Sequence, residues 1–216
     1  MKLWQLKLSG LTDFQKELAA AFLRLDQNNS FVLTGGAALL SHGISSRPTQ
    51  DLDFFTWKSA EVVEQGLENL KSIAKANGWT CEKILDEPEF KRYQINSSEA
   101  LLVDISRDSL LIFPATISEL GHIVSPKELG ARKLLALFDR AAARDFVDLK
   151  ALLEIYEISE LMDLAKIIDS GFSVDVFVYL LSQLEKYSDQ DLAELGENPK
   201  NIRKFFNSIS NKLTKI

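Results

Sequence analysis

Residues 31–57 read FVLTGGAALLSHGISSRPTQDLDFFTW, and this stretch holds the most informative motifs of the chain. An apolar strand leads into Gly35 and Gly36, whose small size lets backbone N–H groups approach an anion closely. Asp51 and Asp53 then open a second apolar run. Because side chains alternate along a strand, both carboxylates are expected on one face, where a cation would offset their repulsion. The stretch therefore predicts a phosphate cradle beside a metal site.

A third carboxylate, Asp104, interrupts the apolar run LLVDIS at residues 101–106. A single buried aspartate is usually a satisfied hydrogen-bond acceptor, but unpaired charge inside an apolar strand is costly. If this strand lies beside the one with Asp51 and Asp53, three carboxylates share one sheet face. Such oxygens suit Mg²⁺ or Mn²⁺, which assist in-line phosphoryl displacement. We therefore predict all three aspartates as metal ligands.

Other uses of an Asp-x-Asp pair are weighed against the neighbouring residues. A calcium loop requires a third acid and a glycine, and Phe54-Phe55 breaks that pattern. An aspartyl-phosphate phosphatase places its nucleophile after a long apolar strand, whereas Asp51 follows Arg-Pro-Thr-Gln. A sugar-nucleotide glycosyltransferase usually has a longer chain with a parallel sheet. It remains an alternative that a preference for UDP-sugars would reveal.

Composition excludes several other classes of protein. The 216 residues carry a net charge of −6, which argues against a protein that coats nucleic acid, although a local basic groove is compatible with it. One cysteine and two histidines exclude an internal disulfide and disfavour zinc sites and a Ser-His-Asp triad. The sequence lacks a signal peptide and any apolar run of about 20 residues. We therefore expect a cytoplasmic protein with no membrane partner.

The chain changes character near residue 125. Up to that point, apolar strands alternate with amphipathic helices, and the strands at 79–85 and 90–95 flank an acidic turn typical of a hairpin. From Ser125-Pro126 onward the pattern is helical throughout. The helices are expected at about 126–140, 142–156, 158–169, 173–187 and 199–214. The sequence predicts an α+β fold, with a mixed-sheet domain at 1–124 followed by a helical domain at 125–216.

Two segments resemble a known family. TGGAAL at 34–39, followed by Arg47, Thr49 and DLDFF, resembles the first motif of the polymerase-beta-like nucleotidyltransferase superfamily. KELGARKLLALFDRAAARDFVDLKALLE at 127–154 resembles the lysine-containing helix and the Arg-Asp-x-x-Asp-Leu helix of the AbiEii/AbiGii toxin family. Members of that family are nucleotidyltransferase-like toxins of type IV toxin–antitoxin and abortive-infection systems. The resemblance covers roughly residues 31–155 and implies a polymerase-beta-like core followed by a helical bundle.

The resemblance implies roles for the residues of the first segment. Gly35 and Gly36 would cradle the nucleotide triphosphate, and Asp51 and Asp53 would hold magnesium. Asp104 matches the third acid, which activates the acceptor hydroxyl. Superfamily members often carry serine after the first glycine, so the second glycine of this chain removes one hydroxyl contact.

Roles in the helical segment are also implied by resemblance. Lys133 would reach the triphosphate, and Arg47 would support a phosphate or the loop. Asp145, or Asp148 one helical turn later, matches the late acidic residue of the family. Without the resemblance, Lys133 would be interpreted as a solvated lysine, and Arg144 with the two aspartates as a surface ion network of little energetic weight.

The function implied is transfer of a nucleoside monophosphate from an NTP to an acceptor hydroxyl, with Mg²⁺ or Mn²⁺ as cofactor. Family members are associated with tRNA 3′ ends, so tRNA is one expected acceptor and a protein hydroxyl is the other. A toxin role would bring a cognate antitoxin as partner. The alternative is a non-catalytic nucleotide- or partner-binding module on the same scaffold.

Overall fold

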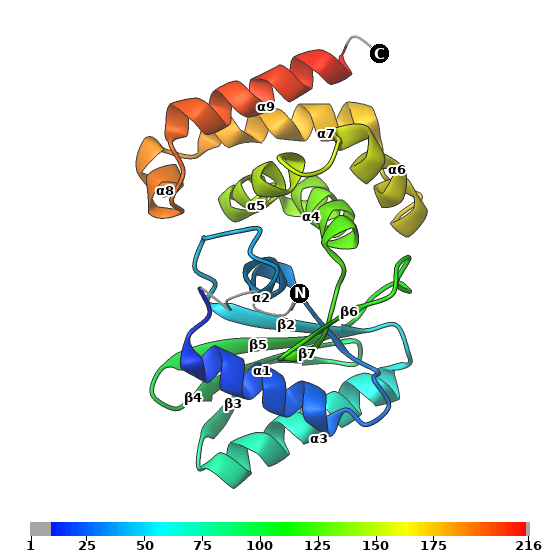
Figure 1. The fold of residues 1–216 in the computed structure, drawn as a ribbon, viewed down its shortest axis with the longest axis vertical. Helices are drawn as coiled ribbons and strands as arrows, with labels where there is room; N and C mark the ends of the chain where they lie inside the picture. The colour runs from blue at the N-terminus through cyan, green and yellow to red at the C-terminus, as the bar shows by residue number, and fades with distance from the viewer. Residues whose placement is uncertain (1–9, 215–216) are drawn as a thin grey trace, which may run out of the picture. The chain divides into compact units, whose positions relative to one another are not determined.

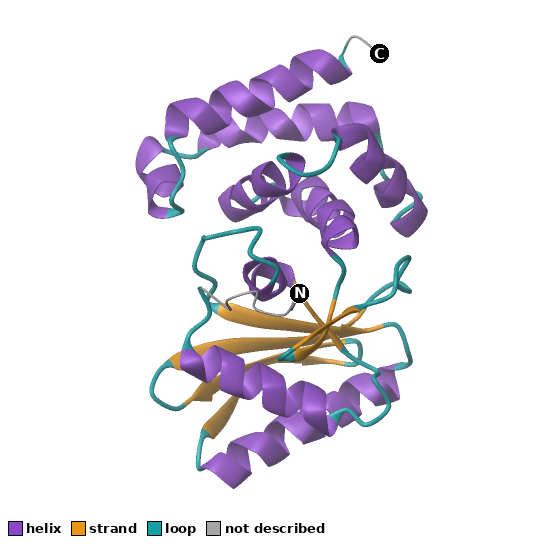
Figure 2. Cartoon of the chain, viewed as in Figure 1, coloured by secondary structure: helices purple, strands orange, loops and turns teal. Residues whose placement is uncertain are grey.

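The computed structural model describes residues 10–214, which are divided between two compact units (Figure 1). Within the described residues, the first unit holds 10–43 and 48–125, and the second holds 44–47 and 126–214. The first unit contains the strands, whereas the second is helical (Figure 2). The predicted boundary at 124/125 lies within one residue of this division, but the structure also assigns the segment 44–47 to the helical unit.

The first unit is built on a seven-stranded mixed sheet in the order β3-β4-β5-β2-β1-β7-β6. Two strand pairs, β2 with β5 and β1 with β7, are parallel, and the other pairs are antiparallel. This confirms the α+β class and the mixed sheet. The sequence did not indicate β6 and β7, because three residues are too few to show an alternating pattern. The strands are β1 Val32–Thr34, β2 Asp51–Thr56, β3 Thr80–Glu87, β4 Phe90–Asn96, β5 Ala100–Arg107, β6 Thr116–Ser118 and β7 Gly121–Ile123.

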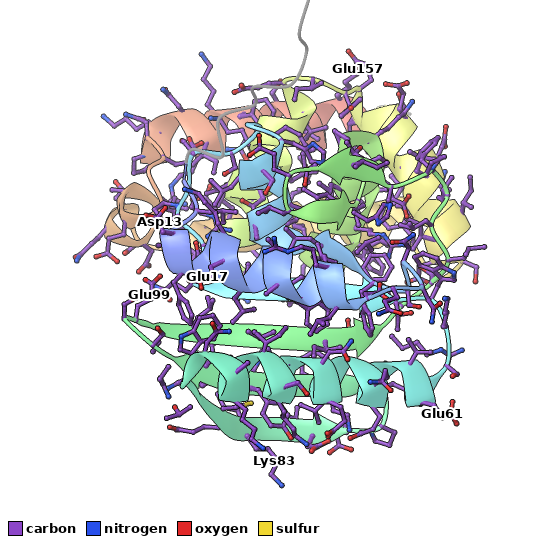
Figure 3. All side chains as sticks on the ribbon, turned by 60° about the horizontal axis from the view of Figure 1, so that its bottom comes forward. Asp13, Glu17, Glu61, Lys83, Glu99 and Glu157 are labelled. Carbon is purple, nitrogen blue, oxygen red and sulfur yellow. The ribbon has the colours of Figure 1, made fainter. Side chains whose placement is uncertain are left out.

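Three helices accompany this sheet: α1 Asp13–Leu25, α2 Gly35–Ser41 and α3 Ala60–Asn77. Helices α1 and α3 cover one face, whereas α2 lies on the other (Figures 1 and 3). A capping box at Thr12 starts α1, and left-handed Gly78 ends α3. The outer surface of these two helices is polar, and Asp13 and Glu61 are exposed there (Figure 3).

The core of the first unit fixes which way the strand side chains face. Phe22 of α1 stacks on Phe54 of β2, with ring centroids 4.2 Å apart. Gly66 of α3 lies directly against Ile105 of β5, because a Cβ there would come within 3.1 Å of it. Phe54 and Ile105 therefore face α1 and α3. Since side chains alternate, the residues just before them in each strand face the opposite side of the sheet.

The second unit packs its helices around an apolar core that includes Phe146, Phe177 and Phe206. The expected helix at 173–187 is two elements, an α-helix followed by a 3₁₀ helix, and the sequence did not indicate α8. The elements are α4 Pro126–Arg140, α5 Ala143–Leu153, α6 Ile158–Ile168, α7 Val174–Leu181, η1 Ser182–Lys186, α8 Asp189–Glu194 and α9 Pro199–Leu213. Across the described residues, we find no helix with the length and apolar character needed to cross a membrane.

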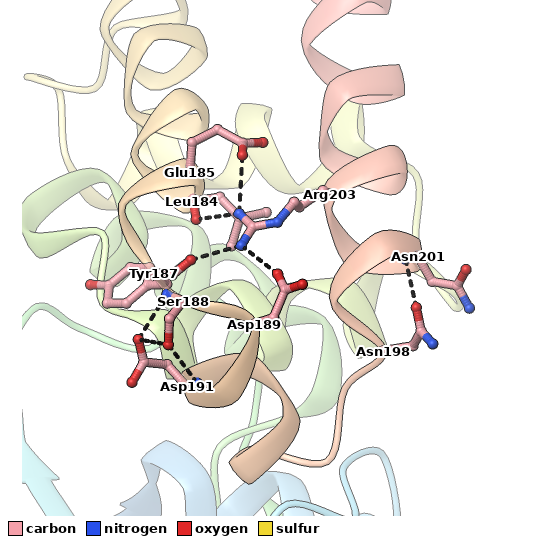
Figure 4. A network of polar contacts seen from close by, with 9 residues as sticks. All are labelled: Leu184, Glu185, Tyr187, Ser188, Asp189, Asp191, Asn198, Asn201 and Arg203. Atoms are coloured by element: carbon pink, nitrogen blue, oxygen red, sulfur yellow. Dashed lines mark hydrogen bonds and ion pairs between the residues drawn. The ribbon is translucent and has the colours of Figure 1, made fainter.

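Arg203 anchors α9 to the segment before it (Figure 4). Its guanidinium donates to the carbonyl oxygens of Leu184, at 2.9 Å, and Tyr187, at 2.7 Å. It also forms ion pairs with Glu185 and Asp189, each at 3.1 Å. One side chain therefore satisfies carbonyls at the end of η1 and fixes α9 beside it.

Candidate active site

The three predicted acids lie on two neighbouring parallel strands. Asp53 of β2 is the register partner of Asp104 of β5, and Asp51 is the partner of Leu102 two positions earlier. Adjacent strands are about 4.8 Å apart, so Asp53 and Asp104 are direct neighbours on one face. That face is opposite to α1 and α3, as the packing of Phe54 and Ile105 requires. The structure thus brings the three acids to one face of the sheet, as the sequence predicts.

Gly35 lies directly against the side chain of Asp53. Its φ of +66° lies in the left-handed region that favours glycine. Thr34, the residue before it, is the register partner of Asp53 in the antiparallel β1–β2 pair. A Cβ on Gly35 would lie 1.8 Å from Oδ2 of Asp53, so any side chain would displace that carboxylate. The absence of a side chain at Gly35 therefore leaves room for the carboxylate of Asp53. The nucleotide-binding role of Gly35 and Gly36 stays a prediction.

Asp51 is held by the residue that leads into β2. The hydroxyl of Thr49 donates to Oδ1 of Asp51 at 2.6 Å. The carbonyl oxygen of Thr49 in turn accepts a hydrogen bond from Nε2 of Gln15 at 2.8 Å. Thr49 is buried, so both contacts are shielded from water. Thr49, two residues before Asp51 in the sequence, therefore fixes the first acid in place.

Arg92 contacts the third acid and is a residue that sequence analysis missed. It lies on β4 directly opposite Asp104 in the antiparallel β4–β5 pair. Its Nε donates to Oδ1 at 2.7 Å, and one of its terminal nitrogens donates to Oδ2 at 2.5 Å. This bond raises the pKa of Arg92, and the charges of Asp53 and Asp51 raise it further. All three acids therefore act on one cation.

The donor chemistry of the three acids matches a metal site only in part. Carboxylate oxygens on one sheet face match the preference of hard divalent cations, and the effect of all three acids on Arg92 shows that this face attracts positive charge. However, in the described part of the chain, no three His, Cys, Asp or Glu side chains are gathered as a metal ion would require. Both oxygens of Asp104 are bound to Arg92 instead. The three carboxylates are therefore the right type of ligand for a divalent cation, but that of Asp104 is bound to Arg92.

A second cluster lies within the helical unit. Nζ of Lys133 on α4 is 2.8 Å from Oδ2 of Asp148 on α5. Arg47 donates to the same carboxylate, from Nε to Oδ1 at 3.2 Å and from a terminal nitrogen to Oδ2 at 3.1 Å. The side chains are 9%, 0% and 8% exposed for Lys133, Asp148 and Arg47. The interpretations of Lys133 as a solvated lysine and of Asp148 as part of a surface network are therefore wrong.

Asp148 stays ionised in spite of its burial. Burial by itself would raise the pKa of this carboxyl. The attraction of Lys133 and the hydrogen bonds and charge of Arg47 act in the opposite direction and outweigh it. The net result is a pKa below the ordinary value, so the carboxylate binds both cations throughout the neutral range.

The structure separates the two candidates for the late acidic residue. Asp145 is fully buried, and its carboxylate receives two bonds from Arg140, at 2.8 Å and 2.9 Å. Asp148, one turn later, is the acid that contacts Lys133. The sequence allowed either residue, because both follow the same Arg-Asp-x-x-Asp spacing. The catalytic role expected for Asp145 stays a prediction, whereas the ion pair with Lys133 belongs to Asp148.

Comparison with protein families decides the identity of this scaffold. A model described as "Nucleotidyl transferase AbiEii toxin, Type IV TA system" matches residues 17–211. The chain belongs to this family. The match includes the acid-bearing strands of the first unit and the Lys133–Asp148 helices of the second. The AbiEii chain described here is thus a nucleotidyltransferase-family enzyme of a type IV toxin–antitoxin system.

Solved structures agree with the AbiEii assignment at the level of the fold. JHP933 from Helicobacter pylori is 24% identical with a TM-score of 0.53, over 94% of this chain and 95% of that one. MenT4, a nucleotidyltransferase toxin from Mycobacterium tuberculosis, is 19% identical with a TM-score of 0.61, over 88% and 80%. The antibiotic-resistance factor ANT(2'')-Ia is 12% identical with a TM-score of 0.51, over 82% and 100%. A search of curated protein sequences gave no match. The fold is that of the polymerase-beta-like nucleotidyltransferases.

Proposed function

We propose that this AbiEii chain transfers a nucleoside monophosphate from an NTP to the hydroxyl of an acceptor. The observation that carries the proposal is the register of β2 and β5, which sets Asp51, Asp53 and Asp104 on one face of the sheet. Carboxylates held in this way suit phosphoryl transfer, in which catalysis depends on placement and on charge stabilisation.

The reaction balances as an in-line displacement. The acceptor oxygen forms a bond to the α-phosphorus, and the bond from that phosphorus to the bridging oxygen of the β-phosphate breaks. Pyrophosphate leaves with the electron pair, and the hydroxyl proton passes to a base. Asp104 matches the family acid with this role, and once it is released from Arg92 its carboxylate could accept that proton.

Asp51 and Asp53, with Asp104, would hold Mg²⁺ or Mn²⁺. A bound divalent cation supplies Lewis-acid stabilisation of the charge on the phosphoryl oxygens. The chain's own contribution is placement: Thr49 orients Asp51, and Gly35 leaves room for Asp53. Removal of either support would shift a metal-binding carboxylate.

The Lys133–Asp148–Arg47 cluster supports a nucleotide-binding role for the helical unit. Asp148 accepts bonds from both cations and so fixes their positions. An ammonium group has three N–H donors, so the pair with Asp148 is compatible with a contact from Lys133 to a phosphate oxygen. In this proposal Asp148 positions Lys133, and Arg47 holds the loop that precedes β2.

Helix α9 favours RNA as the acceptor. It carries Lys200, Arg203, Lys204 and Lys212 and no acidic residue, in a chain with a net charge of −6. A groove of about 970 Å³ follows this face and is lined by these four residues and by Asn207, Ser208 and Asn211. Arg203 is paired with Glu185 and Asp189, and Lys212 with Glu157, so Lys200 and Lys204 are the cations of this surface that we propose for a phosphate backbone. We therefore favour a tRNA 3′ end, and a protein hydroxyl is the other outcome of the test.

Two further parts of the proposal follow from the family. A toxin of a type IV system implies a cognate antitoxin, which we propose as the protein partner of this chain. The cytoplasm, where NTPs and tRNA are both present, is the proposed location. The family assignment supports the antitoxin partner, whereas the location is inferred from where the substrates of the proposed reaction are found.

The test is NTP-dependent labelling of cell extract. The chain is incubated with Mg²⁺, each α-³²P NTP in turn, and total RNA and protein, and the label is then assigned by nuclease and protease digestion. We expect RNA to be labelled by wild type and not by Asp53→Asn. Asp163→Asn, which changes an exposed aspartate on α6, is the matched control and should label like wild type.

The outcomes separate the alternatives. If wild type binds an NTP but labels neither RNA nor protein, the non-catalytic binding module is correct. If UDP-sugars bind and NTPs do not, the sugar-nucleotide alternative is correct. Equal labelling by Asp53→Asn and wild type would remove the proposed metal site, provided that circular dichroism shows both variants folded.

A further inference from the structure

Arg92 binds the carboxylate of Asp104, which the proposed nucleotide transfer uses. It binds both oxygens of Asp104 through a two-pronged contact, and that acid is the direct neighbour of Asp53. A divalent cation that uses Asp104 would require at least one of the same oxygens. Arg92 and the cation are therefore alternative partners of one carboxylate.

We propose that Arg92 is a displaceable counter-ion, which neutralises Asp104 in the metal-free enzyme and competes with the divalent cation for it. The inference rests on the metal site of the proposed function. It makes Arg92 a positioning residue: the guanidinium holds the third acid in place between turnovers and prevents three neighbouring carboxylates from repelling one another.

The exposure of the pair explains why Arg92 can leave. The side chain of Arg92 is 38% exposed, whereas that of Asp104 is 8% exposed. The bidentate contact itself is strong, but a released guanidinium would regain hydration at this exposed position, and a divalent cation would offset the charge left on Asp104. The guanidinium carbon also lies 5.5 Å from the ring centroid of Phe90, a contact that does not depend on Asp104. The buried acid stays in place while the exposed cation can exchange.

Lys91 shows what a fixed pair in the same strand looks like. Because it is the neighbour of Arg92 in β4, its side chain points to the opposite face of the sheet, and it is only 6% exposed. It pairs with both Glu64, at 2.8 Å, and Asp86. Neither of those acids is among the three on the other face. The strand thus carries one cation built into the fold and, next to it, one that is half-solvated at the reaction face.

The competition predicts tighter metal binding when Arg92 is removed. The full chain without NTP is titrated with Mn²⁺, and the free ion is measured by electron paramagnetic resonance. We expect Arg92→Gln to lower the dissociation constant about five- to tenfold, which is within the range of coupling between groups in contact. Arg92→Lys, which keeps the charge but cannot bind both oxygens, should show a smaller decrease.

The matched control is Arg107→Gln. Arg107 is an exposed arginine of β5 paired with Glu89, and by strand alternation it points away from the acid face. The substitution removes the same charge, so any general effect of net charge on Mn²⁺ binding appears in it as well. We expect its dissociation constant to stay within twofold of wild type.

Two further variants decide between the possible failures. In an Asp104→Asn background, Arg92→Gln should no longer tighten binding, because the carboxylate over which the two cations compete is gone. If Arg92→Gln leaves Mn²⁺ binding unchanged or weaker in the native background, or tightens it equally in the Asp104→Asn background, the proposal is overturned. Should Arg92→Gln not fold, the comparison of wild type with Arg92→Lys serves the same purpose. If Asp53→Asn binds Mn²⁺ as tightly as wild type, the metal site itself is wrong.

Discussion

The two ion clusters of this enzyme are built in opposite ways. In the sheet unit, Asp104 is paired with an arginine that is 38% exposed. In the helical unit, Asp148 is fully buried between Lys133 and Arg47, which are each less than 10% exposed. An exposed partner regains hydration when another cation takes its place, whereas a buried triad cannot lose a member without stranding charge. One cluster is suited to chemistry that requires exchange, and the other to holding positions.

The two clusters also differ in how many acids and cations they contain. In the sheet unit, three carboxylates act on one guanidinium. In the helical unit, two cations surround one carboxylate. The first arrangement therefore carries an excess of negative charge and the second an excess of positive charge.

The largest expected effect is the loss of the buried triad. Asp148→Ala leaves two buried cations without their shared partner, and it should lower the free energy of unfolding by about 3–5 kcal/mol. The measurement is urea unfolding followed by circular dichroism at pH 7. Asp163→Ala, which breaks an exposed pair with Lys166 at 3.6 Å, is the control and should cost less than about 1 kcal/mol. Equal losses in the two variants would mean that the triad is not the fixed cluster we describe.

The next effect concerns the space that Gly35 leaves for the side chain of Asp53. Gly35→Ala and Gly78→Ala both place a side chain at positive φ, +66° and +69°, with a strain of about 1–2 kcal/mol each. Only Gly35→Ala brings a Cβ to 1.8 Å from Oδ2 of Asp53, while nothing lies within 4 Å at Gly78. We expect Gly35→Ala to be clearly the less stable and to lose nucleotide transfer, with Gly78→Ala active. If both variants keep full activity, the carboxylate does not depend on Gly35.

The smallest effect is a pH dependence of stability. The folded-state pKa of Asp148 lies below its ordinary value of 3.8, so the unfolded chain binds this proton first as the pH falls. The carboxylate therefore stabilises the fold above about pH 3.8, and this contribution is lost as the pH drops through the folded-state pKa. The slope from one group is at most about 1.4 kcal/mol per pH unit. Urea unfolding between pH 6 and pH 3 should show a shallower decline for Asp148→Asn than for wild type; parallel curves would contradict the assignment.

The acid cluster of the sheet unit was predictable because its pattern is local. Asp51 and Asp53 are two residues apart, and strand alternation alone places them on one face. Asp104 required only the assumption that its apolar strand lies beside theirs, and the register confirms it. The pairing of Arg92 with Asp104 needs the register of β4 on β5, which residue types do not determine. Sequence analysis of the hairpin could have proposed it only after that register was fixed.

The cluster of the helical unit was predictable in its helices and not in its contacts. The start of α4 follows from Ser125-Pro126, a local signal. The bond between Arg47 and Asp148 joins residues 101 positions apart, and no periodicity links them. The same spacing could not separate Asp145 from Asp148, because the choice depends on which cation each acid meets after packing.

The segment 44–47 makes the two units of this chain inseparable as pieces of sequence. It lies between two parts of the sheet unit and yet belongs to the helical unit. A cut at residue 125 would leave Arg47 on one fragment and Asp148 on the other, so the helical fragment would contain a buried carboxylate with one of its two cations. The sequence boundary near residue 125 therefore does not separate two interchangeable modules. An exchange of helical halves between relatives would have to carry this four-residue loop along with it.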